Sequence, residues 1–441
     1  MPRDAQGLEI TGSPDSAESY DRAIADYYAL GGDPVGKLKA ALARDDRFAL
    51  APTAIAALFL AGGFRSDHAE VARALKAARA LSSRATPRER LHLEAIETWA
   101  EGRLRDATAV WEEILIDHPT DALALRLAQD GYFFLGASAA LRDSVARVWP
   151  EWRADDPLTS FVMGLRAFGL EETGDYLAAE RWAREALARN PADAWAAHAL
   201  AHVFEMTSRP EDGVAFLTAS RDGWRNAHFM AGHNGWHLAL YLIELGRIDE
   251  VLDGFDRHML PALKADATLD RVDAAALLWR LELEGVEVGG RWAPVSRQWA
   301  AHVHEHVLAF NDLHLALAAV RAPDSGLREL LRDSLDGYAK EGQGDNAAVM
   351  AAVGRPLIEA MFDFAEGRYA EAAERILPLR YDVWRIGGSH AQRDVVDLTA
   401  VVAAERAGEN SLARALLAER AALRPTERWR ARLAKARAVG A

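Results

Sequence analysis

The sequence predicts an all-α protein built as a helical-repeat solenoid of antiparallel helix pairs, and three observations predict it. Apolar residues recur three and four positions apart, with alanine and leucine dominating. Short Gly, Pro or Asp breaks separate segments of about 12 to 16 residues, which is the length of ordinary globular helices. The breaks also recur at regular intervals, as expected for stacked repeats. The alternating apolar pattern of strands is nearly absent.

Seven predicted turns between helices follow one pattern: Gly102, Gly136, Gly174, Ser208, Gly246, Gly367 and Gly408. The first five turns follow one another at steps of 34, 38, 34 and 38 residues. A small residue five positions after the turn, a bulky one four later and a closing proline complete a tetratricopeptide pattern. Ala107, Trp111 and Pro119 fill these places in one repeat. The small residue lets two helices approach closely, and the proline ends the second helix.

The repeat pattern predicts four segments along the chain. Residues 1–16 read as a flexible polar arm, and residues 17–265 as tetratricopeptide-like helical hairpins. Residues 266–350 fit the repeat poorly, so we expect an irregular helical segment there. It contains a long helical pattern from Val295 to Ala322. Residues 351–441 return to tetratricopeptide-like repeats.

Composition restricts the classes of partner and chemistry. The chain has 441 residues, a net charge of −14 and no cysteine. The acidic balance predicts no nucleic-acid partner and no membrane partner, because both attractions depend on Lys and Arg. Thiolate chemistry and cysteine metal sites are excluded. With no apolar leader in the first residues and no stretch long enough to span a bilayer, we expect a cytoplasmic protein. A homo-oligomer is among the assemblies left open.

Several long stretches are distinctive, among them "HPTDALALRLAQDGYFFLG", "NPADAWAAHALAHVFEM", "HNGWHLALYLIELGRIDE" and "LPLRYDVWRIGGSHAQRDV". On these stretches the chain resembles the tetratricopeptide repeat protein 38 family, found in bacteria and animals, as a bacterial member over nearly its full length. The resemblance implies a helical-repeat fold for the whole chain and no particular chemistry. Phe204 stands where relatives often carry histidine, and His390 replaces an asparagine.

Ten of the fourteen histidines lie between His198 and His314. Six of them form pairs four residues apart: His198/His202, His233/His237 and His302/His306. Chance placement, 14 × 14/441, would give roughly 0.4 such pairs. Residues four apart lie on the same helix face, so each pair presents two imidazoles side by side.

A tetratricopeptide register places two of these pairs on the concave face. In such repeats the first helix of each pair lines the groove. If repeats begin at residues 194 and 232, the histidines face a pocket with aromatic walls, the usual form of a small-molecule site. The expected lining is Trp195, His198, His202, Glu205, His233, Asn234, Trp236 and His237, with Phe168 from the preceding helix.

Three interpretations of this pocket remain open. The histidines can serve only to pack adjacent helices. His198, His202, His233 and His237 can instead hold a divalent metal, Zn²⁺ or Fe²⁺, although no HExxH order is present. Without metal, these four histidines and Glu205 are the catalytic candidates for acid–base chemistry, or they capture a ligand. We expect first a module that binds a small molecule or short peptide, and as the alternative an enzyme for hydrolysis or proton transfer on a small substrate.

Two further clusters are candidate ligand contacts. In "FNDLHLALA", Asn311 and His314 would face the same cavity if the irregular segment folds across the groove; otherwise they lie on a surface helix. In "GGSHAQRD", Ser389 is a candidate helix N-cap, and Arg393 follows in the first turn. A helix N-terminus beside an arginine can receive an anion.

Overall fold

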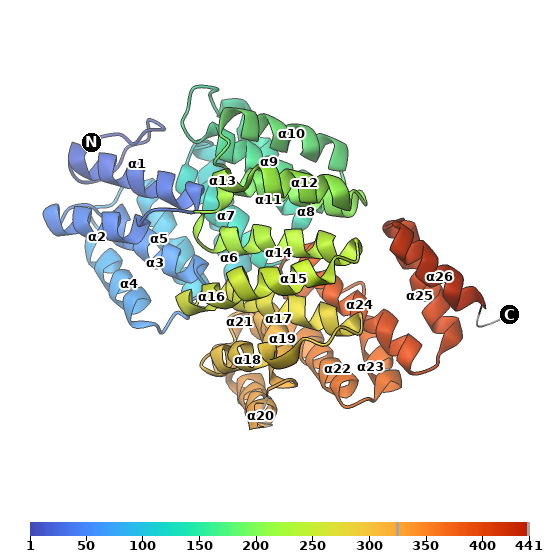
Figure 1. The fold of residues 1–441 in the computed structure, drawn as a ribbon. Coiled ribbons are helices and arrows are strands. Elements are labelled where there is room, and N and C mark those ends of the chain that lie inside the picture. The colour runs from blue at the N-terminus through green and yellow to red at the C-terminus, as the bar shows by residue number, and fades with distance from the viewer. Residues whose placement is uncertain (323–325, 439–441) are drawn as a thin grey trace. The chain divides into compact units, whose positions relative to one another are not determined.

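The computed structural model describes residues 1–322 and 326–438, and it confirms the all-α prediction. Within these residues the only strand-like pairing is an isolated bridge between Arg3 and Glu9, and every longer element is a helix (Figure 1). The chain divides into two compact units. The first unit comprises residues 1–199, 223–230 and 343–345, and the second comprises residues 200–222, 231–342 and 346–441.

The first unit is a succession of helices joined by short turns. They are α1 (Pro14–Ala29), α2 (Pro34–Arg44), α3 (Leu50–Ala61), α4 (Ala69–Leu81), α5 (Pro87–Ala100), α6 (Leu104–Asp117), α7 (Ala122–Phe134), α8 (Ser138–Val148), α9 (Thr159–Glu172) and α10 (Tyr176–Arg189). Consecutive helices such as α5 and α6, or α9 and α10, pack on each other. Short connections between packed neighbours make antiparallel hairpins, so these pairs are the expected repeats.

The second unit holds the later helices. They are α12 (Pro210–Ala219), α15 (Ile248–Gly254), α16 (Leu260–Ala262), α17 (Thr268–Leu283), α18 (Trp292–Ala300), α19 (Ala309–Ala319), α20 (Gly326–Glu341), α22 (Arg355–Ala365), α23 (Tyr369–Ile376), α24 (His390–Arg406), α25 (Asn410–Leu423) and α26 (Glu427–Ala438). Four helices pass from one unit to the other along the chain: α11 (Ala194–Met206), α13 (Arg221–Trp224), α14 (His228–Glu244) and α21 (Gly344–Val349).

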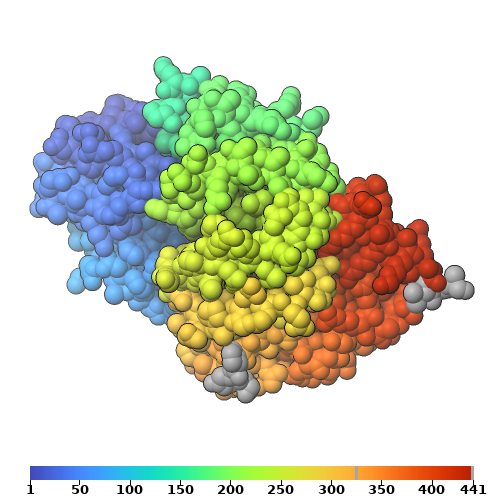
Figure 2. Space-filling model, in the orientation of Figure 1, coloured from blue at the N-terminus to red at the C-terminus, as the bar shows by residue number. Residues whose placement is uncertain are grey.

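Helix α17 is the centre of the second unit. Nearly all of its residues are buried, and it contacts α18, α19 and α24. In the space-filling view, residues 240–300 pass from yellow-green to yellow over one continuous surface (Figure 2). Each unit has a hydrophobic core of its own, one around Trp111 and the other around Trp279. A helix buried on all sides holds its polar side chains in fixed positions, which matters for the site below.

The repeat turns adopt the backbone conformation that the sequence pattern predicts. Gly102, Gly136, Gly174 and Gly246 have φ between 64° and 85°, the left-handed region that ends helices. Ser208 has φ 58° at the equivalent turn, although a side chain makes this conformation unfavourable. The prediction that Ser208 replaces glycine in the repeat is therefore confirmed.

The N-terminal residues differ from the flexible arm expected from their polar composition. The Asp4 carboxylate accepts hydrogen bonds from the Leu8 and Gln6 amides, at 2.8 Å and 3.1 Å. Ile10 is fully buried, and the Thr11 hydroxyl donates to Glu89 at 2.9 Å. Local carboxylate turns and one apolar anchor fix this segment, and α1 then begins at Pro14.

The irregular segment also differs from expectation in one place. A single helix from Val295 to Ala322 is wrong, because α18 ends at Ala300 and α19 begins at Ala309. His306 has φ 47° in the turns between them. His302 and His306 therefore do not share a helix face, and the side-by-side arrangement expected from their spacing is absent.

Candidate functional site

Three buried histidines of the second unit gather where α11 and α14 contribute side chains. His202 comes from α11, and His233 and His237 from successive turns of α14. Each offers a ring nitrogen within 4.8 Å of those of the other two. The ring centroids of His202 and His237 are 4.5 Å apart, and those of His233 and His237 are 4.9 Å apart. The four-residue spacing on α14 thus puts two imidazoles side by side, as the sequence predicts.

Carboxylates orient two of these three rings. His233 Nδ1 lies 2.8 Å from Asp273 Oδ2 on α17, and His237 Nδ1 lies 3.2 Å from Glu205 Oε2 on α11. In a neutral imidazole that donates from Nδ1 to a carboxylate, Nε2 carries the lone pair. Burial lowers the pKa of His237 to about 3, so this ring is neutral at neutral pH. Such a set of rings can bind a metal ion or move a proton.

Glu205 connects the histidines to a group of arginines. Its Oε1 accepts a 2.8 Å hydrogen bond from Arg424 while Oε2 faces His237. Burial alone would raise the pKa of Glu205, but Arg424 and His237 hold it well below its ordinary value. The side chain is therefore an anion shared between a guanidinium and an imidazole.

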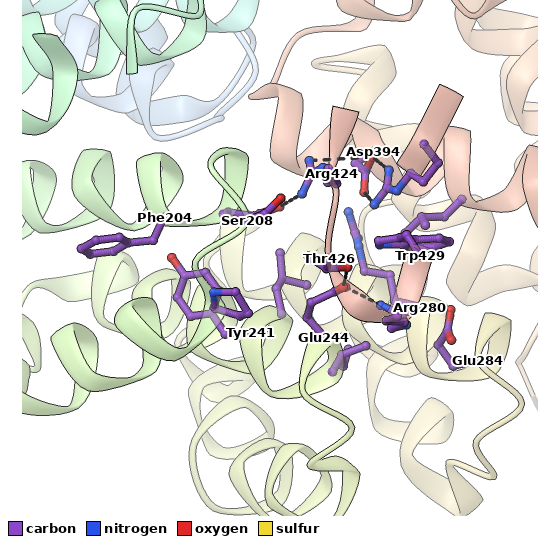
Figure 3. A pocket seen from close by; sticks show the side chains of 17 residues that line it. Phe204, Ser208, Tyr241, Glu244, Arg280, Glu284, Asp394, Arg424, Thr426 and Trp429 are labelled. Atoms are coloured by element: carbon purple, nitrogen blue, oxygen red, sulfur yellow. Dashed lines mark hydrogen bonds and ion pairs between the residues drawn. The ribbon is translucent and has the colours of Figure 1, made fainter. Parts of the chain in front are cut away.

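A cavity of about 60 Å³ lies beside this carboxylate. The side chains that line it include four arginines, four acids and aromatic rings: Arg280, Arg420, Arg424, Arg428, Glu205, Glu244, Glu284, Asp394, Phe204, Tyr241 and Trp429. In Figure 3, Phe204 and Tyr241 lie at one end of the cavity, and Arg280 and Trp429 lie together at the other.

Three of the arginines form ion pairs with the acids of the cavity wall. Arg420 makes a two-pronged contact with Asp394, whose pKa is lowered to about 2 by Arg420 and Arg424 although burial opposes this shift. Arg428 pairs with Glu244 at 2.7 Å and with Glu284 at 2.5 Å. These pairs satisfy every acid of the wall, because Glu205 pairs with Arg424.

Arg280 is the exception. Its side chain projects from α17 and donates only to backbone carbonyls, at 2.9 Å to Ala391, 3.2 Å to Gln392 and 3.3 Å to Ala276. Among the described residues no carboxylate lies within ion-pair distance of Arg280, and the residue is 4% exposed. Burial lowers its pKa to about 10, so the guanidinium is still charged at neutral pH.

Aromatic stacking joins Arg280 to the histidines. Its guanidinium lies 5.1 Å from the centre of the Trp236 ring, and Trp236 stacks on His233 at 5.3 Å with an interplanar angle of 10°. Trp236 is thus buried behind the cavity wall and does not line it. The Trp236 ring therefore contacts both the Arg280 guanidinium and the His233 imidazole.

The other predicted site residues lie in several places. His198, one turn before His202 on α11, belongs to the first unit and contacts Phe168 and Trp195 at 5.2 Å and 5.1 Å. Asn234 is buried on α14. Asn311 lines a second cavity of about 10 Å³ together with His302 and His306. Of all the predicted residues, only Glu205 lines the larger cavity.

The histidines of the irregular segment have local partners. His302 contacts Glu305 at 2.8 Å and Asp266 at 2.9 Å, and His306 contacts Asp312 at 3.1 Å. His314 is fully buried, and its Nδ1 donates to the Phe310 carbonyl at 2.8 Å. Burial lowers the pKa of His314 to about 4. A surface position for His314 is therefore wrong.

At the start of α24 the N-cap prediction is confirmed. The Ser389 hydroxyl accepts from the Gln392 amide at 3.2 Å, and the Gln392 side chain accepts from the Ser389 amide at 3.1 Å, which forms a capping box. Arg393 turns back and donates to the carbonyls of Gly387 and Gly388. The Arg393 guanidinium thus binds the loop that precedes α24.

Sequence reasoning missed the arginine-lined cavity. Arg420, Arg424 and Arg428 recur at four-residue spacing, which is a detectable signal. They come, however, from the end of α25, the link after it and the start of α26. Arg280 gives no comparable signal, because a lone arginine in an apolar segment reads as an ordinary snorkelling residue.

Solved structures of IFIT1 are similar to this chain over nearly the full length of both proteins. The human IFIT1 dimer with m7Gppp-AAAA is 14% identical, covers 98% of this chain and 97% of that chain, and has a TM-score of 0.40. A monomeric mutant of IFIT1 with Gppp-AAAA is 13% identical, with coverages of 98% and 96% and a TM-score of 0.39. No family model matches the chain, so the finer resemblance to the tetratricopeptide repeat protein 38 family is not confirmed.

The comparisons overturn one expectation about partners. The exclusion of nucleic acid is wrong as it was drawn, because the IFIT1 structures contain m7Gppp-AAAA or Gppp-AAAA. The physical reason is that a net charge of −14 is a sum over the whole chain. It does not report how charged side chains are distributed, for example the four arginines and four acids that line one cavity. Separately, none of the described helices is both long and apolar enough to cross a membrane.

Proposed function

We propose that the second unit binds a small oxyanion, a carboxylate or a phosphate, in the arginine-lined cavity. The observation that carries this proposal is the buried guanidinium of Arg280, the only charged group of the cavity wall without an ion pair among the described residues. Backbone carbonyls accept its hydrogen bonds but cannot neutralise its charge. A buried charge that lacks a partner is costly, and an oxyanion would remove that cost.

The chemistry of the guanidinium favours an oxyanion over other ligands. Arginine presents a planar fork of donors that matches the oxygens of a carboxylate or a phosphate. The Arg280 guanidinium also lies 5.1 Å from the centre of the Trp236 ring, a cation–π contact that helps to hold it in place. The acids of the wall are already paired with Arg420, Arg424 and Arg428. A cationic ligand would have to break those pairs, whereas an anion needs only Arg280.

The size of the cavity favours a small molecule over a peptide. A volume of about 60 Å³ corresponds to roughly four to six water molecules. Phe204 and Tyr241 at the far end provide an apolar wall for a short carbon chain. The ligand class that fits is therefore a compact acid with a few non-hydrogen atoms. The wider pocket lined by histidine and tryptophan stays a prediction. Glu205 connects its histidines to this cavity, because it contacts both His237 and Arg424.

The test is calorimetric titration with inorganic phosphate, acetate and succinate, and with neutral succinamide as the uncharged analogue. We expect binding of at least one anion and none of succinamide. Arg280→Gln should weaken binding at least tenfold, about 1.4 kcal/mol, which is the lower range for a charge-assisted contact. The control is Arg257→Gln, since Arg257 is a surface residue paired with Asp253. Equal binding by Arg280→Gln, or no binding of any anion by the folded protein, would refute the proposal.

A second candidate is the enzyme predicted as the alternative. The pairs His233–Asp273 and His237–Glu205 each join an imidazole to an orienting carboxylate, as in general acid–base catalysis. Turnover of small ester and phosphate-ester substrates that is lost in His237→Gln and kept in His258→Gln would support it. Turnover that survives in His237→Gln would count against it. Membership of the tetratricopeptide repeat protein 38 family and a cytoplasmic location stay predictions from the sequence.

A further inference from the structure

We infer that His202, His233 and His237 form a binding site for a divalent transition-metal ion of the Zn²⁺ class. This site is distinct from the arginine-lined cavity and does not depend on an anion binding there. The three rings come from two helices and are all buried. The chain has no cysteine to offer a metal ion. Apart from the methionine thioether, imidazole is therefore its softest available ligand.

The ring nitrogens are gathered closely enough for one metal ion to reach all three after a small adjustment. Zn²⁺ bonds imidazole nitrogen at about 2.0–2.1 Å, so two such ligands of a tetrahedral site lie about 3.4 Å apart. The nitrogens offered by His202, His233 and His237 lie within 4.8 Å of one another. A shift of about 1 Å at each ring nitrogen would bring the three to bonding distance. Three imidazoles leave a fourth tetrahedral position for water or a ligand.

The carboxylates behind the rings provide the second observation. Metal-binding histidines commonly donate their other ring nitrogen to a carboxylate, which fixes the tautomer and the orientation of the ring. His233 and His237 both do so, to Asp273 and to Glu205. A buried ring that only packs helices together needs one hydrogen-bond acceptor, and a backbone carbonyl is enough, as Phe310 provides for His314. A divalent cation would balance the charge of Asp273, whose only ion-pair partner among the described residues is His233, whereas Glu205 already pairs with Arg424.

The surroundings of the site hold this arrangement in place. Asp273 comes from the buried helix α17, and its side chain is 1% exposed. Trp236 stacks on His233 and contacts His237 edge-on at 4.9 Å. His390, at the first position of α24, stacks on His202 at 5.8 Å between centroids. Rotamers locked by such packing are what a preorganised metal site requires.

The experiment uses untagged full-length protein, because a polyhistidine tag would itself bind metal. Elemental analysis after native purification should show about one transition-metal ion per chain. Protein stripped with a chelator should regain one equivalent of Zn²⁺ in a competition titration. Co²⁺ should give the visible absorption of a tetrahedral site. His233→Ala and His237→Ala should each weaken Zn²⁺ binding at least a hundredfold.

Two controls separate metal binding from folding. His258→Ala removes an exposed histidine of the same unit, and His314→Gln replaces a fully buried one outside the cluster. Both should bind Zn²⁺ as the parent protein does. Asp273→Asn keeps the shape of the orienting side chain and should weaken Zn²⁺ binding about 10- to 100-fold.

Three outcomes would overturn the inference: no uptake of Zn²⁺ or Co²⁺ by folded protein, unchanged affinity in His233→Ala, or equal loss in His314→Gln. Arg280→Gln distinguishes this inference from the proposed anion site. It should lose phosphate or carboxylate binding while its Zn²⁺ affinity stays unchanged. Each proposal can therefore fail without the other.

Discussion

Asp193 shows how a single buried carboxylate makes the first unit sensitive to pH. Its Oδ1 accepts from the Ala196 amide at 2.9 Å and caps the start of α11. Its Oδ2 is buried without a hydrogen-bond partner among the described residues. Burial raises the pKa of Asp193 to about 7. The folded protein therefore keeps a proton that the unfolded chain releases near pH 4, so this residue lowers stability as pH rises from about 4 to 7.

Asp193→Asn should remove this dependence, because the amide keeps the cap and never ionises. Relative to the parent, the variant should gain up to about 1.4 kcal/mol of unfolding free energy for each pH unit between 4 and 7. Above pH 7 the difference should stay constant. Urea unfolding followed by circular dichroism from pH 4 to 8 measures this. A difference that does not change with pH would contradict the assigned ionisation.

For single residues, the sequence predicts the arrangement of the histidines better than that of the arginines. Residues four apart on a helix face are visible in one dimension, and His233 and His237 lie as their spacing indicates. The property that distinguishes Arg280 is the absence of an ion pair, which depends on α17, α24, α25 and α26 together. The partners of His233 and Arg424 lie 40 and 219 residues away in sequence. No local pattern encodes those pairings.

Between elements, glycine sets how closely two helices of the second unit approach. A Cβ at Gly213 on α12 would overlap the ring of Tyr241 from α14. That ring is buried, and its hydroxyl donates to the Ala201 carbonyl. The ring can therefore give way only by breaking a hydrogen bond or by separating the helices.

Gly213→Ala should accordingly destabilise the second unit by about 1–3 kcal/mol, the usual cost of overpacking. The matched control is Gly337→Ala on α20, where an added Cβ meets nothing within 4 Å. This control should gain up to about 1 kcal/mol from helix propensity. Thermal unfolding of both variants measures the contrast. A stabilised Gly213→Ala would show that the contact between α12 and α14 relaxes freely.

The helix boundaries agree with those predicted from the sequence where glycine marks a turn, and they differ between α18 and α19. The turns at Gly102 and Gly174 lie where expected. The break between α18 and α19, residues 301–308, reads "AHVHEHVL" and contains no glycine or proline. Tertiary partners hold it open: Ser334 faces His306 at 2.8 Å, and the Asn346 side chain accepts from the Ala309 amide at 2.7 Å. Such contacts override helix propensity and leave no trace in local pattern.

At the scale of the whole molecule, the repeat class is visible in the sequence and the division into units is not. Turn spacing and apolar period are local properties, so they predict helix pairs correctly. The two units instead exchange short stretches of chain, such as residues 223–230 and 343–345, which belong to the first. Assigning these stretches requires knowing which core each side chain enters, and that is a property of three-dimensional packing.

Because each unit has its own core, we expect that a substitution that destabilises the first unit leaves the proposed binding sites of the second unit intact. Trp111 is fully buried in the core of the first unit, and Trp99 packs on it edge-on at 5.8 Å. Trp111→Ala should cost about 3–5 kcal/mol. Hydrogen exchange should then accelerate mainly in residues 1–199, while α17 and α24 stay protected. Phosphate or carboxylate affinity and Zn²⁺ affinity, both assigned to side chains of the second unit, should change less than twofold. Equal acceleration in both units would mean that the two cores unfold as one cooperative structure, and the helices that pass between them would then be the elements that couple them.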